Sequence, residues 1–190
     1  MLAVILLAIV LSQGSLAVVK EREIGNLEQL AVTPLRGSEL LVGKSILYVA
    51  LGLIMTVMVT VAARLWFQVP VRGSFLCLLV CVVLYLMCVL GIGLLVSVVS
   101  RTQVQAQLTA TILISPLLLL SGFLFPIANM PTWAQWVSYA MPTRYVMEIM
   151  RGIFLKGQGF VELWPQATAL GGFGVLFYLL GILSFKKRVD

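Results

Sequence analysis

Histidine is absent from this sequence of 190 residues, and charged residues are scarce. Acidic residues number seven and basic residues 13, so that only 11% of the chain is charged. Without histidine, general-base catalysis and imidazole-ligated metal sites lose the side chain that serves them most often. The apolar segments also hold no recognisable pair of nucleophile and base, which argues against catalysis inside a membrane. The composition therefore points away from an enzyme.

Hydrophobic residues, in contrast, make up 61% of the chain, and its mean hydropathy is +1.09. A soluble domain could not keep so much apolar surface away from water. In a soluble protein the net charge of +6 would suggest nucleic acid, but here the basic residues stand mostly at the ends of apolar runs, which indicates membrane topology. We therefore predict an all-α integral membrane protein, surrounded by membrane lipid and without a nucleic-acid partner.

Five apolar runs are candidates for membrane helices. They cover about residues 1–19, 46–63, 75–99, 104–125 and 166–185. We treat 1–190 as a single transmembrane domain, in which a charged segment, 20–44, and a segment rich in proline and aromatic residues, 126–165, connect the spans. An alternative for the first run is a cleaved signal peptide, because Ser15-Leu16-Ala17 loosely fits a cleavage site. No Lys or Arg precedes that run, which disfavours this alternative.

The charged segment 20–44 contains apolar residues at helical spacing, namely Ile24, Leu27, Leu30 and Ala31. Pro34 must end such a helix, because it has no N–H and biases Thr33 away from the helical region. The pattern predicts an amphipathic helix from Glu21 to Ala31. A short helix held between two membrane helices suits the transmission of force, and a helix lying on the membrane surface is the alternative.

Small residues mark one side of two of the predicted spans. Cys77, Cys81 and Cys88 fall within about 40° of one another on a helical wheel, with Gly91 near the same face. Three thiols could bind a soft metal, but no further Cys or His completes a site, and close packing of helices explains them better. The last span carries a similar set, at Ala167, Gly171, Gly174 and Gly181. We therefore predict close helix packing and no metal site.

Polar residues follow a broad arc of the fourth span, at Gln103, Gln107, Thr111, Ser115 and Ser121. Polar side chains in hydrocarbon usually turn toward protein or a wet cavity. The set therefore has two interpretations, the lining of a substrate path and hydrogen bonding between helices. Glu148 similarly could meet a cationic substrate or form an ion pair with Arg144 or Arg151 on a short helix.

Nucleotide binding by this chain is not indicated. The stretch Gly37–Ser45 is similar to a phosphate-binding loop, but it has one residue too many between its glycines, and no apolar strand precedes it. Any ATP must therefore act through a partner.

The basic residues also predict an orientation. If segment 20–44 is cytoplasmic, eight of the 13 Lys and Arg residues lie on the inside, in agreement with the positive-inside rule. Five spans then place the N-terminus outside and the C-terminus in the cytoplasm.

Several motifs carry a resemblance to a known family. Lys20–Pro34, followed by Glu39–Lys44, resembles the signature after the second membrane helix in the permease subunits of type-2 ATP-binding-cassette (ABC) exporters of the multidrug type. Three later features fit the same family: Leu120–Pro126, Met130-Pro131 with Trp133 and Trp136, and Met141–Gly157. The resemblance covers essentially the whole chain.

The resemblance implies a six-helix permease of a bacterial inner membrane. Such a permease works as a dimer, with a second copy or a paralogue, and with two cytoplasmic ATPase subunits that bind ATP and Mg; this chain itself holds no cofactor. In the family the segment matching Glu21–Pro34 is the coupling helix, which docks into a groove of the ATPase. The residues carried over to that role are Glu21, Glu23, Ile24, Gly25, Leu27, Glu28, Leu30 and Pro34. The segment matching Pro126–Lys156 dips into the outer leaflet as short helices.

The sequence departs from the family at its start, where the first membrane helix and the external domain of multidrug-type members are absent. We expect the C-terminal part of a permease, either as a fragment or with an upstream piece supplied separately. The resemblance implies export by alternating access, with the chain forming the substrate path. A truncated permease that acts as a membrane scaffold or regulatory docking subunit is the alternative. Drugs or lipids suit the apolar lining, but polymer and cofactor exporters share similar permeases.

Overall fold

The computed structural model describes residues 1–25, 37–66, 68 and 73–189, without the side chains of residues 37–40 and 186–189. Within this part of the chain all regular structure is helical, which confirms the all-α prediction. The α-helices are α1 Leu2–Leu16, α2 Val19–Ile24, α4 Gly37–Leu65, α5 Phe75–Val99, α6 Gln103–Leu119, α7 Thr132–Ser138, α8 Pro142–Arg151 and α9 Phe160–Val189. Two short elements join them, the 3₁₀ helix η1 Ile127–Asn129 and the π-helix η2 Gly152–Lys156.

Four segments of the described chain are long and apolar enough to cross a membrane: Leu2–Ile24, Leu41–Leu65, Phe75–Val99 and Phe160–Phe185. They correspond to four of the five predicted spans. The fifth, predicted at 104–125, is the 17-residue helix α6. At a rise of 1.5 Å per residue it is roughly 26 Å long, somewhat short of a hydrocarbon core of about 30 Å. The chain is a multi-pass membrane protein.

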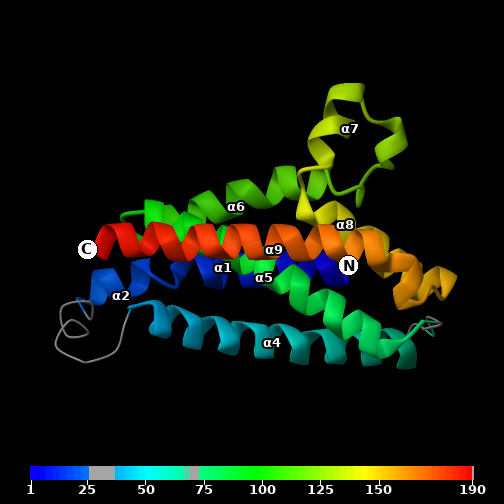
Figure 1. Cartoon of the computed structure of the whole chain (residues 1–190), viewed down its shortest axis with the longest axis horizontal. Coiled ribbons are helices and arrows are strands. Elements are labelled where there is room, and N and C mark those ends of the chain that lie inside the picture. Colours follow the sequence, from blue (N-terminus) through cyan, green and yellow to red (C-terminus); the bar gives the residue numbers. More distant parts are fainter. Residues whose placement is uncertain (26–36, 67, 69–72, 190) are drawn as a thin grey trace.

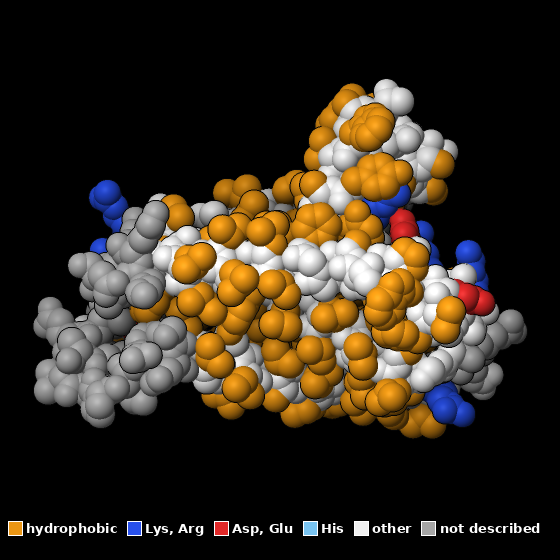
Figure 2. All heavy atoms as spheres, in the orientation of Figure 1, with side chains coloured by type: hydrophobic (Ala, Val, Ile, Leu, Met, Phe, Trp, Pro, Cys, Tyr) orange, Lys and Arg blue, Asp and Glu red, His pale blue; other side chains and the backbone are white. Residues whose placement is uncertain are grey.

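Helix α5 lies at the centre of the bundle and packs against α1, α4, α6, α8 and α9. The N-terminus lies at the end of the bundle near α8, and the C-terminus lies at the other end with α2 (Figure 1). Hydrophobic side chains cover the middle of the face shown in Figure 2, and charged side chains lie toward its two ends. This distribution suits a bundle whose long axis crosses the membrane.

Glycines allow α5 to approach its two main neighbours closely. A Cβ atom at Gly93 would lie 2.9 Å from the Cα of Gly14 in α1, and a Cβ at Gly91 would lie 2.5 Å from the backbone of Phe177 in α9. Gly174 and Gly181 of α9 likewise face α5, because a Cβ at either position would meet α5 atoms within 3.2 Å. These contacts confirm the predicted packing through small residues.

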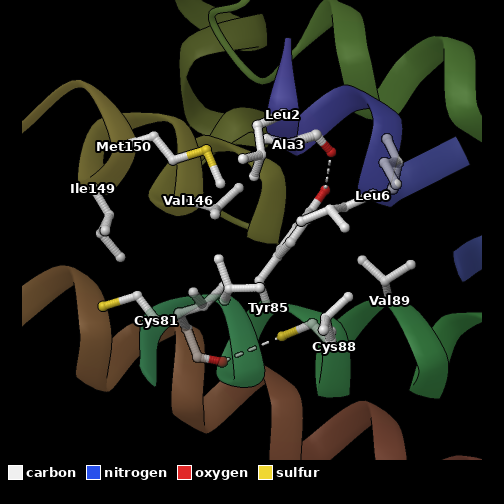
Figure 3. Packing of buried hydrophobic residues seen from close by; sticks show 14 of the residues in the cluster. Leu2, Ala3, Leu6, Cys81, Tyr85, Cys88, Val89, Val146, Ile149 and Met150 are labelled. Atoms are coloured by element: carbon white, nitrogen blue, oxygen red, sulfur yellow. Dashed lines mark hydrogen bonds between the residues drawn. The ribbon is translucent and has the colours of Figure 1, made fainter. Parts of the chain in front are cut away.

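The predicted cysteine face lies in the hydrophobic core. Cys77, Cys81 and Cys88 are all buried. Figure 3 shows two hydrogen bonds that leave α5 toward different helices: the Tyr85 hydroxyl donates to the Ala3 carbonyl of α1 over 3.4 Å, and the Cys88 thiol donates to the Leu170 carbonyl of α9 over 3.2 Å. The cysteines therefore contribute to packing between helices.

The segment between α6 and α9 has an exposed part and a buried part. Helix α7 stands apart from the bundle, with Trp133 and Trp136 exposed (Figure 1). Helix α8 instead packs into the core through Val146 and Ile149, and η2 continues that contact through Ile153. Figure 1 places α7 and α8 toward the end of the bundle at which α1 begins.

The last helix begins earlier than the predicted span 166–185, because α9 starts at Phe160 and contains Pro165. The prediction took this proline as a boundary. Pro165 is the sixth residue of α9, so the helix lacks only the one backbone hydrogen bond that this position would donate to the carbonyl of residue 161. The proline therefore lies within the helix, close to its beginning.

Candidate coupling site and substrate path

Helix α1 and helix α2 meet at a bend held by α5. The helical run is interrupted at Ala17 and Val18, and the backbone N–H groups of Val18 and Val19 donate to the Ser97 hydroxyl oxygen over 2.9 and 3.1 Å. Ser97 is buried, with 1% of its surface exposed. Backbone donors without a partner in an apolar setting are costly, so Ser97 stabilises the bend.

Lys44, in the second turn of α4, contacts both helices at this bend. Its ammonium group donates to the Ala17 carbonyl over 3.3 Å and to a Glu21 carboxylate oxygen over 2.5 Å. The side chains of Lys44 and Glu21 are only 25% and 18% exposed. Water and salt therefore screen this ion pair less than a fully exposed one, and the pair fastens the beginning of α2 to α4.

Glu23 connects α2 to α6. One carboxylate oxygen accepts the backbone N–H of Gln103 over 2.9 Å, and the other accepts the Gln103 side-chain amide over 2.6 Å. Gln103 is the first residue of α6, where unpaired backbone N–H groups and the helix dipole favour a carboxylate. The six residues of α2 are thus bound to α4, α5 and α6 while continuing from α1.

The predicted helix from Glu21 to Ala31 is wrong in its extent, because α2 ends at Ile24. The next residue, Gly25, has a φ of 78°, the left-handed conformation in which a helix commonly ends at glycine. Ile24 and Gly25 are exposed at this tip. Four of the predicted coupling residues, Leu27, Glu28, Leu30 and Pro34, lie outside the described residues, so their role stays a prediction.

Comparison with known sequences decides the family. The sequence profile of the ABC-2 type transporter family matches residues 1–155, the greater part of the chain. The chain belongs to this family. The bend, α2 and the bundle from α1 to α8 all lie within the matched region.

Similar proteins include transport permeases of Escherichia coli strain K12. The chain is 36% identical over 177 residues to "Probable multidrug ABC transporter permease YbhS", an alignment that covers 93% of this chain and 47% of YbhS. It is 31% identical over 188 residues to "Inner membrane transport permease YhhJ", covering 97% of this chain and 49% of YhhJ. ABC transporter G family member 20 of Dictyostelium discoideum is 26% identical over 190 residues, covering 99% of this chain and 26% of that protein. The chain spans about half the length of the bacterial relatives it matches.

In this ABC-2 protein the five candidate residues of the substrate path do not share one surface. Gln103 binds Glu23, and Gln107 donates from its side-chain amide to the Ser12 hydroxyl of α1 over 3.1 Å. Ser121 is buried, donates to the Leu118 carbonyl and accepts the N–H of Phe123. Thr111 and Ser115 are exposed on α6. Thr111 also donates within the chain, to the Gln107 carbonyl over 2.8 Å. Hydrogen bonding within the chain thus involves four of the five residues, and the lining of a substrate path by this set stays a prediction.

At the other end of the bundle the predicted pairing of Arg144 with Glu148 is confirmed. The two side chains form an ion pair of 3.2 Å, and Arg144 also donates to the Ser138 hydroxyl over 2.7 Å. Its guanidinium carbon lies 3.9 Å from the centre of the Tyr139 ring. Arg151 does not form the alternative pair, because it donates to the Gly122 carbonyl over 2.7 Å. These contacts join α7 to α8.

Two residues of the coupling site were missed by reasoning from the sequence. Ser97 is a polar residue in an otherwise apolar span, one turn after Gly93, which was a usable signal. From the sequence, Lys44 serves only to predict the orientation in the membrane.

The arrangement holds the short helix α2 against several membrane helices. Such an arrangement can transmit displacement. Within the described residues, no group of three His, Cys, Asp or Glu side chains could hold a metal ion.

Proposed function

We propose that this chain is the coupling part of the permease of an ATP-driven exporter. The main support for this proposal is that α2 is hydrogen-bonded to three other helices. Glu21 contacts α4, Ser97 of α5 contacts the beginning of α2, and Glu23 contacts α6. The names of the bacterial relatives, which are transport permeases, support this proposal. ATP and Mg belong to a separate cytoplasmic ATPase, and a second permease copy or a paralogue completes the transporter.

The proposed mechanism is alternating access. When ATP closes the ATPase dimer, the tip of α2 at Ile24 and the segment that follows it move with the ATPase. The contacts of Glu21 pass this displacement to α4, and those of Glu23 pass it to α6, which carries Thr111 and Ser115. A change in the position of α6 alters access to the path, as in other transitions in which packed helices shift between two arrangements.

The proposed orientation places α2 and the C-terminus in the cytoplasm. The positive-inside rule supports it. At the opposite end of the bundle a cavity of about 370 Å³ lies between α1, α4, α8 and η2. Its walls include Val59, Met147 and Phe154, with Thr60 and Arg151 as polar members. A cavity of this character suits an apolar or amphiphilic substrate, in keeping with the multidrug name of YbhS.

The decisive experiment begins with the permease that contains this chain, purified gently with whatever ATPase it binds and reconstituted in vesicles. ATP should drive the movement of an apolar fluorescent amine across the membrane. Leu27→Asp should uncouple the two activities, leaving ATP hydrolysis while transport falls at least severalfold, because a charge replaces an apolar contact of the predicted coupling segment. Wild-type transport in that variant would contradict the coupling role. A stable complex with the ATPase that moves none of a panel of drugs and lipids would support the scaffold alternative.

A further inference from the structure

The bend between α1 and α2 is placed by a glycine contact one turn away. Gly14 of α1 and Gly93 of α5 touch, and the residues four positions further along the two helices are Val18 and Ser97. Residues four apart lie on the same helix face, so the close approach at the glycines brings the Ser97 hydroxyl directly to the interrupted backbone. The position of Ser97 against the bend is thus a consequence of the packing of α1 on α5.

Ser97 differs from four other buried serine and threonine residues that lie in the long helices or at their ends. Ser45, Thr56, Thr60 and Ser100 each donate to the carbonyl four residues earlier in their own helix, over 2.7 or 2.8 Å. The Ser97 oxygen instead accepts two N–H groups of another segment, 78 and 79 residues away in the sequence. Ser100 lies three residues further on, is equally buried, and therefore provides a matched control.

We infer that Ser97 is a positioning residue for energy coupling, which fixes the direction in which α2 leaves α1. The inference rests on the proposed function. With the hydroxyl in place, Glu21 reaches Lys44 and Glu23 reaches Gln103, so that a displacement of α2 moves α4 and α6. Without it, the N–H groups of Val18 and Val19 lose their acceptor, and α2 can turn relative to α1 without moving the other helices.

The first test is amide hydrogen exchange of the complete permease in lipid nanodiscs. Ser97→Ala should speed the exchange of the Val18 and Val19 amides roughly tenfold or more, because a buried donor without a partner is destabilised. Ser97→Thr should restore slow exchange, since it keeps the acceptor oxygen, and Ser100→Ala should leave these amides unchanged. Rapid exchange at Val18 and Val19 in the wild-type protein would overturn the inference.

The second test measures the number of substrate molecules transported per ATP hydrolysed, in vesicles containing the permease and its ATPase. Ser97→Ala should lower this ratio severalfold while the ATPase still co-purifies, and Ser97→Thr should restore it. Ser100→Ala should keep the wild-type ratio. An unchanged ratio in Ser97→Ala, with faster exchange at the bend, would show that Ser97 only stabilises the fold and would overturn the inference.

Two provisions keep these tests decisive. If Ser97→Ala fails to insert into the membrane, Ser97→Cys takes its place, because sulfur is a weaker hydrogen-bond acceptor of similar size. Ser97→Cys should change the exchange of the Val18 and Val19 amides and the transport per ATP in the same directions, but less. Faster exchange of these amides with a wild-type transport per ATP would overturn the inference. If the wild-type complex shows no ATP-driven movement of any substrate, the proposed function fails. The inference about Ser97 fails separately, when the wild-type complex transports substrate and Ser97→Ala leaves the transport per ATP unchanged.

Discussion

Gly91 occupies the place where α5 and α9 leave no room for a side chain. A Cβ atom there would lie 2.5 Å from the carbonyl carbon of Phe177 and from the nitrogen of Tyr178. Both are backbone atoms, so no rotation of a side chain can relieve the contact. Gly91→Ala should therefore lower the free energy of unfolding by about 1–3 kcal/mol, the usual cost of overpacking. Denaturant titration of the purified protein in detergent micelles measures this change.

The matched control for Gly91 is Gly172 in α9, where an added Cβ would meet no atom within 4 Å. Gly172→Ala should leave stability unchanged or raise it by up to about 1 kcal/mol, because alanine is the better helix former. Equal stability of the two alanine variants would contradict the close approach of α5 and α9 at Gly91.

Lys44 shows how one residue serves two purposes. Its position after the charged segment fits the positive-inside rule, and its ammonium also binds the Ala17 carbonyl and Glu21. Composition alone supports only the first purpose. The second depends on the fold, which places the beginning of α4 close to the bend. Lys44 thereby meets Ala17 and Glu21, which lie 27 and 23 positions earlier in the sequence.

At the scale of the element, the end of α2 is the clearest difference between the predicted and the observed coupling segment. Apolar periodicity predicted a helix through Gly25, whereas the structure ends the helix there in a left-handed residue. Gly25 lies inside the predicted pattern, where an isolated glycine costs about 1 kcal/mol relative to alanine and is a signal that a helix can end. The predicted pattern itself, beyond residue 25, lies outside the described residues.

Gly25→Ala tests this end of the helix. At a φ of 78° an alanine is strained by roughly 1–2 kcal/mol, although a Cβ would meet no atom within 4 Å. Hydrogen exchange of the peptide covering α2 should therefore become about fivefold faster or more, because the local structure is destabilised. Gly159→Ala is the control, since Gly159 has equal space and no positive φ. Slower exchange in Gly25→Ala would indicate a helix that continues past residue 25 and would contradict the observed cap.

The other helices and their contacts could be predicted from the sequence to different degrees. Long apolar runs specified the spans of α1, α4, α5 and α9, because burial in lipid depends on composition and length rather than on neighbours. The faces of small residues predicted where α5 and α9 pack, and the structure confirms this at Gly91, Gly174 and Gly181. The partners of Ser97, Gln103 and Gln107 could not be predicted, because they depend on which helices lie side by side. Only tertiary structure supplies that information.

At the scale of the whole molecule, the bundle has two ends with different contents. One end holds α2 and the C-terminus, and the N-terminus and α8 lie toward the other, with α7 standing to the side of the bundle there (Figure 1). Both ends carry charged groups, and the middle of the visible face is apolar (Figure 2). This arrangement follows from spans that cross the membrane side by side, and it separates the proposed coupling site from the cavity at the far end.

The separation of the two ends predicts opposite exposure of two engineered cysteines. Ile24 at the tip of α2 and Ala128 in η1 are both exposed, so a cysteine at either position should react with a maleimide that cannot cross the membrane. Ile24→Cys should react only in inside-out vesicles, and Ala128→Cys only in right-side-out vesicles or intact cells. The native Cys77, Cys81 and Cys88 are buried in the core and should stay unlabelled in the parent protein, which serves as the control. Labelling of both cysteines from the same side would contradict a bundle that spans the membrane along its long axis, and labelling of Ile24→Cys from outside would reverse the proposed orientation.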